Sequence, residues 1–149
     1  MDDSLLQLGR AVLAAQGFSR LIGAELTACS DDGIEIRLKM RDDFRQQYGS
    51  VHGGVLCYLA DNSLTFAGGV VMKANVVTAE LTINYLRPAF GSELIARAKA
   101  ISCGRTQAVA RCEIYSLEDD RERLCAAGQG MIALAGRASP AAALEGATP

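Results

Sequence analysis

Residues 52–72 read HGGVLCYLADNSLTFAGGVVM, and the expected architecture is built around this segment. Its apolar residues cover most of a helical circumference instead of one stripe, which is typical of a helix that is buried on most sides. The glycine pair Gly68-Gly69 predicts that the helix ends or loosens at these two residues. We therefore expect one long central helix that the rest of the chain encloses.

Strand-like segments lie on both sides of the predicted helix. Before it, strict alternation over residues 34–40 follows a Ser-Asp-Asp-Gly turn, which indicates a hairpin with residues 24–28. Because helices and strands do not alternate along the chain, the sequence favours an α+β fold over a parallel doubly wound sheet. We predict an antiparallel sheet of about five to six strands wrapped around the helix. Four of these strands follow the helix, at residues 76–86, 93–102, 106–117 and 123–134.

The length of 149 residues corresponds to one domain with short flanking segments. Residues 1–22 carry apolar side chains at helical spacing, and Gly9 and Gly17 favour two short helical pieces over one helix. Residues 23–135 are expected to form the main domain. Residues 136–149 are rich in Ala, Gly and Pro, which predicts a disordered C-terminal tail.

The composition excludes several classes of protein. The 15 basic and 17 acidic residues leave no excess of positive charge for nucleic acid. His52 is the only histidine, and no two of the five cysteines form a Cys-x-x-Cys pair, so we expect no metal site. The cysteines are interpreted as core thiols of a reducing compartment. The chain starts acidic, and its longest apolar stretches are interrupted well short of the ~18 residues that span a bilayer, so we predict a soluble, cytoplasmic protein without membrane contact.

Asp61 is the residue that fits least well into the predicted helix. An unpaired buried carboxylate costs several kcal/mol or shifts its pKa upward, and Asp is a mediocre helix former. One interpretation is that Asp61 points outward through a polar seam with Asn62, Ser63 and Thr65. The other, which the strongly apolar surroundings favour, is that Asp61 is a functional carboxylate.

The second candidate motif is Gly-Ser-Val-His-Gly-Gly at residues 49–54, where the predicted helix begins. Free backbone N–H groups at a helix N-terminus stabilise negative charge, which an oxyanion hole for acyl transfer requires. The alternative is that Gly53 and Gly54 only allow a tight turn and that His52 is structural.

The spacing between these motifs predicts how they cooperate. Gly53 and Asp61 are eight residues apart, about 12 Å along a helix, so they cannot both contact one carbonyl group. If two copies pair their central helices antiparallel, the helix start of one copy approaches Asp61 of the other. We therefore expect a homodimer with two equivalent sites if both residues act together.

With these motifs, the chain resembles the hotdog-fold acyl-CoA thioesterases of the PaaI-like branch, named for phenylacetic acid degradation. The resemblance covers roughly residues 20–135. The matching residues are those at 49–54, then Asp61, then TAELTINYLRPA at 78–89, and finally Gly104-Arg105.

The resemblance implies a hotdog fold, hydrolysis of an acyl-CoA to free acid and CoA, and pairing of subunits, often as a dimer of dimers. Asp61 takes the position of the family's catalytic acid and Gly53 that of the amide that polarises the thioester carbonyl. His52 lies near the thioester sulfur or supports the loop. Gln46 stands where relatives have an Asn that holds the water, and Thr78 matches a Ser or Thr that assists the water.

The substrate's CoA is the only cofactor-like group that the resemblance implies. Its phosphates suggest arginines at the mouth of the site, and Arg87 and Arg105 are candidates unless they are solvated loop residues. Tyr58, close to Asp61 along the helix, lines the acyl pocket or packs in the core. Gly54 and Gly104 complete the predicted substrate-binding set.

Two other functions remain open for such a chain. A hotdog dehydratase or hydratase would use a histidine–acid pair in a different context. A non-catalytic acyl-CoA-binding protein would have no need of a carboxylate beside an apolar acyl group. Within the thioesterase interpretation, Asp61 either deprotonates a water molecule or attacks the thioester to form a mixed anhydride.

Overall fold

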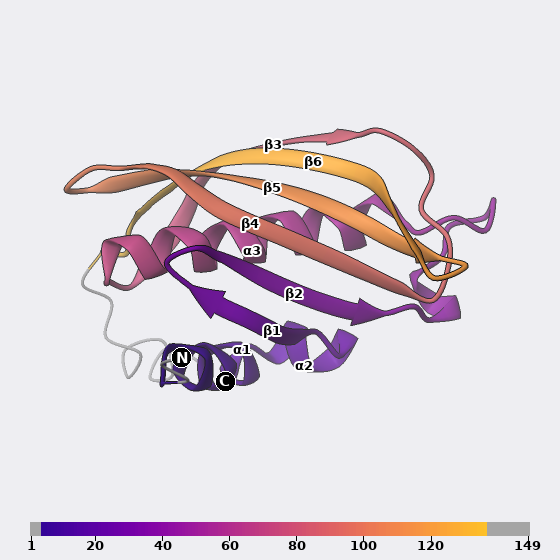
Figure 1. Ribbon diagram of the computed structural model, residues 1–149, viewed down its shortest axis with the longest axis horizontal. Coiled ribbons are helices and arrows are strands. Elements are labelled where there is room, and N and C mark those ends of the chain that lie inside the picture. The colour runs from indigo at the N-terminus through magenta and orange to yellow at the C-terminus, as the bar shows by residue number, and fades with distance from the viewer. Residues whose placement is uncertain (1–3, 137–149) are drawn as a thin grey trace, which may run out of the picture.

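The computed structural model describes residues 4–136 and has a six-stranded antiparallel sheet curved around one long helix (Figure 1). Neighbouring strands follow the order β1-β2-β4-β5-β6-β3, so β1 and β3 form the two edges. The predicted α+β architecture is confirmed, with six strands. Their bounds are β1 Glu25–Ser30, β2 Gly33–Lys39, β3 Val76–Tyr85, β4 Glu93–Cys103, β5 Gln107–Glu118 and β6 Arg121–Leu134.

The central helix α3, Gly53–Met72, packs on the concave face of the sheet. Leu56, Leu59, Ala60 and Leu64 are almost completely buried there. Strand residues supply the other half of the core, and β5 buries alternate residues against the helix. Within the described residues, α3 is also the helix that is long and apolar enough to cross a membrane by length and composition. Its packing against β3, β4, β5 and β6 accounts for that apolar composition.

The prediction that Gly68-Gly69 ends or loosens this helix is wrong, because α3 continues to Met72 and ends at Lys73 in the left-handed conformation. Gly68 instead allows the helix to approach the sheet closely. A Cβ atom added there would lie 2.6 Å from the Ile132 Cβ on β6, whereas one added at Gly69 would lie 3.3 Å from a Val76 methyl group. Gly68 therefore allows α3 to pack closely against β6.

Adjacent substitutions test this role. Gly68→Ala is expected to lower the free energy of unfolding by about 1–3 kcal/mol, because the added methyl group would overlap the β-branched carbon of Ile132, which cannot turn away as a flexible side-chain end would. Gly69→Ala should change it by less than about 1 kcal/mol, because the gain in helix propensity offsets the tighter contact. Urea unfolding of both variants measures the difference. Equal destabilisation by both would contradict the packing argument.

Two short helices, α1 Ser4–Ala15 and α2 Gly17–Ile22, precede the sheet, and α1 packs on β1. Gly9 lies inside α1, where an added Cβ would come 2.5 Å from a Leu26 methyl group. The expected break falls at Gln16, which caps α2 in an extended conformation. The predicted C-terminal tail lies outside the described residues, apart from Gly136.

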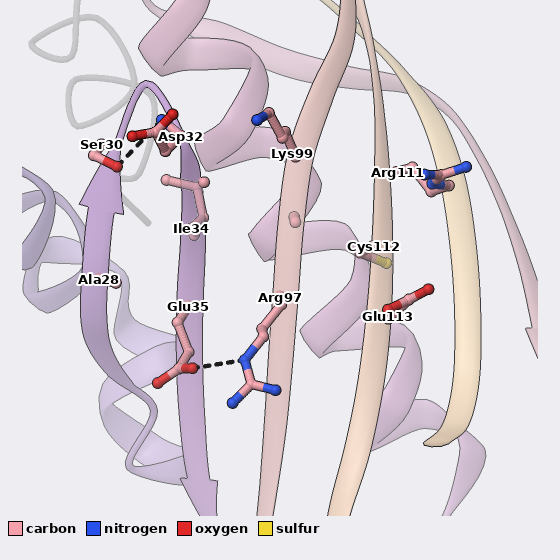
Figure 2. Close-up of a pocket in the computed structure, with 12 residues that line it drawn as sticks. Ala28, Ser30, Asp32, Ile34, Glu35, Arg97, Lys99, Arg111, Cys112 and Glu113 are labelled. Carbon is pink, nitrogen blue, oxygen red and sulfur yellow. Dashed lines mark hydrogen bonds and ion pairs between the residues drawn. The ribbon is translucent and has the colours of Figure 1, made fainter. Parts of the chain in front are cut away.

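Ion pairs connect strands on the convex face of the sheet. Figure 2 shows Glu35 on β2 facing Arg97 on β4, and the Arg97 Nε lies 2.8 Å from the Glu35 Oε2. Arg37 Nε is also 2.8 Å from the other Glu35 oxygen. Burial alone would raise the pKa of the Glu35 carboxyl, but hydrogen bonds from Arg37, Arg97 and Thr27 outweigh it and lower the pKa to about 2. Ionised Glu35 therefore stabilises the folded state.

This stabilisation predicts a specific dependence on pH. Because the folded pKa lies below the ordinary value of 4.5, the contribution is complete above pH 4.5 and is lost as the pH falls toward 2. Glu35→Gln should lower the free energy of unfolding at pH 7 by about 1–2 kcal/mol and flatten its acid dependence. Urea unfolding at several pH values measures both. Glu25→Gln, which alters an exposed carboxylate on β1, should keep the wild-type slope.

Strand β3 is the edge that matters for the site. It is hydrogen-bonded on one side to β6, and no other strand of residues 4–136 pairs with its second side. Val77 and Tyr85 on this strand are 51% and 54% exposed. Long edge strands with free N–H and C=O groups are templates for pairing with another chain.

Candidate active site

Gly53 and Asp61, two of the predicted site residues of α3, lie in a row along the helix, beside β3. Gly53, Cys57, Asp61 and Thr65 follow each other at intervals of four residues, which places them on successive turns. At the N-terminal end of this row, the Tyr85 hydroxyl donates a hydrogen bond of 3.1 Å to the Gly53 carbonyl oxygen. At the other end, Thr65 meets Thr78 of β3.

His52 caps the start of α3. Its Nδ1 accepts a 2.9 Å hydrogen bond from the Gly54 N–H, and its side chain is otherwise exposed. A neutral imidazole that accepts at Nδ1 carries its proton on Nε2 and directs that donor outward. The Gly53 N–H has no acceptor among residues 4–136. This amide is free to bind a ligand oxygen.

Gln46 braces the loop that leads into the helix. Its Nε2 donates to the Ser50 Oγ at 2.6 Å, and its Oε1 accepts from the Tyr48 N–H at 2.6 Å. Backbone hydrogen bonds between Gln46 and both Ser50 and Gly49 close the same loop. The side chain is thus engaged in the loop, and one amide hydrogen of Nε2 remains for another partner.

Asp61 is half-buried on α3, and no cation in the described range forms an ion pair with its carboxylate. One turn further, the Thr65 Oγ1 donates a 2.8 Å hydrogen bond to the Asp61 backbone carbonyl and lies 2.7 Å from the Thr78 Oγ1. The structure therefore places Thr78 of β3 in contact with Thr65, the residue one helical turn from Asp61.

Tyr58 is turned toward the N-terminal helix α2. Its hydroxyl lies 2.6 Å from the Ser19 Oγ and accepts a 2.9 Å hydrogen bond from the Asn62 Nδ2, and its ring meets Phe18 edge-on with centroids 5.4 Å apart. Burial raises the pKa of the Tyr58 phenol, the hydrogen bonds lower it, and the charge of Asp61 raises it further. The Tyr58 side chain therefore packs against α2.

The two candidate arginines lie at opposite ends of α3. Arg87 follows Tyr85 by two residues, and Tyr85 contacts Gly53 at the start of the helix. The Arg87 backbone N–H donates a hydrogen bond to the Cys125 carbonyl oxygen. Gly104 and Arg105 belong to the β4–β5 turn near the C-terminal end of α3 (Figure 1). Neither arginine has an ion-pair partner within residues 4–136. One protomer thus does not bring them together.

No metal cluster accompanies this row of residues. Groups of three or more His, Cys, Asp or Glu side chains that could hold a metal ion are absent from the described part of the chain. A hollow of about 460 Å³ opens on the convex sheet face, lined by charged residues such as Glu35, Lys99 and Arg111 (Figure 2). It contains none of the predicted site residues.

Sequence reasoning missed three residues that contact the predicted site residues. The sequence marks Thr65 only as part of a polar seam, although its i+4 spacing from Asp61 is a usable signal. Tyr85 stands in the quoted strand, but only the fold brings its hydroxyl to Gly53. Ser19, which binds Tyr58, is 39 residues away in sequence and gave no signal.

Comparison with known proteins shows the family of the chain. The family model of the thioesterase superfamily matches residues 48–122. A Haemophilus influenzae protein provisionally described as an esterase is 31% identical over 106 residues, covering 70% of this chain and 75% of its own. Human acyl-coenzyme A thioesterase 13 is 27% identical, with coverage of 72% and 79%.

Solved structures give the fold class. The Escherichia coli PaaI protein of the phenylacetic acid degradation operon has a TM-score of 0.78 at 21% identity, covering 89% of this chain and 94% of its own. A thioesterase family protein from Silicibacter pomeroyi has a TM-score of 0.79 at 25% identity, with coverage of 89% and 100%. The fold is thus that of the hotdog thioesterases. The chain belongs to the thioesterase superfamily.

Proposed function

We propose that the chain is an acyl-CoA thioesterase of the PaaI-like branch, which hydrolyses its substrate to free acid and CoA. The observation that carries the proposal is the row on α3. With Thr78 of β3, which contacts Thr65, this row combines an unpaired carboxylate at Asp61, a hydroxyl and the open amide of Gly53. A base, a water-binding group and an oxyanion donor are what thioester hydrolysis requires.

The active unit is a homodimer, which itself associates into a pair of dimers. Gly53 and Asp61 lie about 12 Å apart along one helix, so each site takes its amide from one protomer and its carboxylate from the other. The open edge of β3, next to this row, is suited to pairing with its copy. An antiparallel arrangement also places Arg87 of one protomer and Arg105 of the other on the same side of the site.

In this site the thioester carbonyl accepts a hydrogen bond from the Gly53 N–H, which stabilises the developing oxyanion. Asp61 of the partner subunit removes a proton from water, or attacks the carbonyl itself to form an anhydride that water hydrolyses. His52 directs its Nε2 proton toward the leaving sulfur. Arg87 and Arg105 bind the phosphates of CoA. Tyr58 borders the acyl group.

Incubation with a panel of acyl-CoAs and a thiol reagent tests the proposal. Release of free thiol supports hydrolysis. A change in double-bond absorbance without thiol release would identify a dehydratase or hydratase, and binding without either would identify a carrier or sensor. Small-angle scattering on the same samples should give a dimer or a larger assembly. Stable single protomers with full activity would overturn the shared site.

A further inference from the structure

We propose that Thr65 is a positioning residue: it fixes the direction of the Thr78 hydroxyl, so that Thr78 accepts a hydrogen bond from the attacking water and does not donate one to it. This inference rests on the proposed function. It adds a residue to the site and assigns the polarity of the hydrogen bonds around the water, that is, which group donates and which accepts.

The polarity follows from counting protons. A threonine hydroxyl has one proton to donate and two lone pairs that accept. The Thr65 proton is used, because its Oγ1 donates to the Asp61 backbone carbonyl at 2.8 Å. The contact of 2.7 Å between the Thr65 and Thr78 Oγ1 atoms therefore has Thr78 as its donor. The proton of the Thr78 hydroxyl is then engaged in the hydrogen bond to Thr65, so this oxygen can only accept hydrogen bonds from other groups in the site.

This polarity suits a nucleophilic water. Water that attacks a carbonyl must direct an oxygen lone pair at the carbon and its two hydrogens elsewhere. The Asp61 carboxylate accepts and removes one hydrogen, and the Thr78 Oγ1 accepts the other, which stays on the oxygen and ends in the product acid. A hydroxyl that donated to the water would compete for the attacking lone pair. Two acceptors therefore hold the water in the productive orientation.

The local backbone supports a dedicated contact between the two threonines. The pairing of β3 with β6 shifts register between Thr78 and Glu80, which marks an irregularity in an otherwise regular ladder. Such bulges redirect a side chain and are frequent near active sites. Here the irregularity adjoins the strand residue whose hydroxyl meets α3. Both threonine side chains are half-buried, so the contact is partly shielded from bulk water.

Thr65→Val tests the proposal because valine keeps the shape of threonine and removes the hydroxyl. The Thr78 proton loses its acceptor and turns toward the water. We expect kcat to fall about tenfold with little change in KM, because one oriented hydrogen bond in the transition state is lost. Thr65→Ser, which retains the hydroxyl, should restore kcat to within about twofold of wild type.

The double variant separates positioning from a structural role. If Thr65 acts through Thr78, Thr65→Val should cost nothing further in a Thr78→Val background. Thr82→Val removes an exposed hydroxyl from the same strand and serves as the matched control, with unchanged kcat. Unchanged kcat in Thr65→Val, or losses that multiply in the double variant, would overturn the proposal. An inactive wild type would instead overturn the proposed function.

Neutron diffraction from deuterated crystals gives a readout that does not depend on activity. Deuterium on the Thr78 Oγ1, directed at Thr65, together with deuterium on the Thr65 Oγ1, directed at the Asp61 carbonyl, supports the proposed polarity. Deuterium on Thr65 that points at Thr78 overturns it.

Discussion

Asp61→Asn is expected to lower kcat for acyl-CoA hydrolysis by at least about a hundredfold, because a positioned base contributes about 10²- to 10⁴-fold and an amide cannot remove a proton. The same loss is expected if Asp61 is the nucleophile, because the amide oxygen is a poor one. Thiol release measures kcat. KM should change little, since the shape of the side chain is preserved.

Thermal stability is the control for the Asp61→Asn variant, because the fold should tolerate this substitution. Asp61 is half-buried and has no ion pair among residues 4–136, so an isosteric amide leaves no charge unpaired. The melting temperature of Asp61→Asn should remain within about 3 °C of wild type. Hydrolysis at a near-normal rate by this variant would remove Asp61 from the mechanism.

Gly53→Pro is expected to lower kcat by about 10²- to 10³-fold, because proline removes the N–H proposed to bind the oxyanion. Gly53 is the first residue of α3, a position where proline suits a helix. The preceding His52 already has φ −61° and ψ 133°, a conformation that a residue before proline adopts. The helix should therefore begin as before without the amide donor.

Gly53→Ala is the matched control for this variant. Its Cβ would lie 3.3 Å from the Tyr85 ring, as would that of proline, but alanine keeps the N–H. A loss of only a few-fold in Gly53→Ala, against the large loss in Gly53→Pro, assigns the effect to the hydrogen bond. Equal losses in both variants would show that crowding against Tyr85, and not the amide, decides the rate.

The two inactive variants also test the shared site in one experiment. A dimer of one Asp61→Asn chain and one Gly53→Pro chain contains one intact site, built from the unchanged residue of each. Co-refolding equal amounts should recover about a quarter of wild-type activity, because half of the dimers are mixed and one of their two sites is intact. No recovery would mean that Gly53 and Asp61 do not act across subunits.

The sequence predicted the elements well because their signals are local. Alternation over residues 34–40 and the apolar coverage of 52–72 each reflect contacts within one element, so periodicity reports them directly. The strand order was not accessible in this way. β3 pairs with β6, but the alternation of residues 76–86 does not indicate which strand this segment pairs with. The prediction for Gly68-Gly69 failed because close approach to Ile132 outweighs the low helix propensity of glycine.

The candidate site was predicted in part for the same reason. Gly53 and Asp61 stand out by their position on a single helix, which sequence spacing describes. The direction of Tyr58 toward Ser19 and the contact of Thr65 with Thr78 depend on packing between elements. The hydrogen bonds of Gln46 to Tyr48 and Ser50 could not be predicted from sequence either, because they arise from the shape of a loop without periodicity.

The strand order also has a consequence for synthesis. β3 is complete at Tyr85, but its hydrogen-bonding partner β6 ends only at Leu134. On the ribosome, Thr78 and Tyr85 therefore emerge long before the strand that pairs with β3, so their contacts with α3 are expected to become fixed late. Until then the nascent chain carries an apolar, unpaired strand, the kind of segment that chaperones protect during translation.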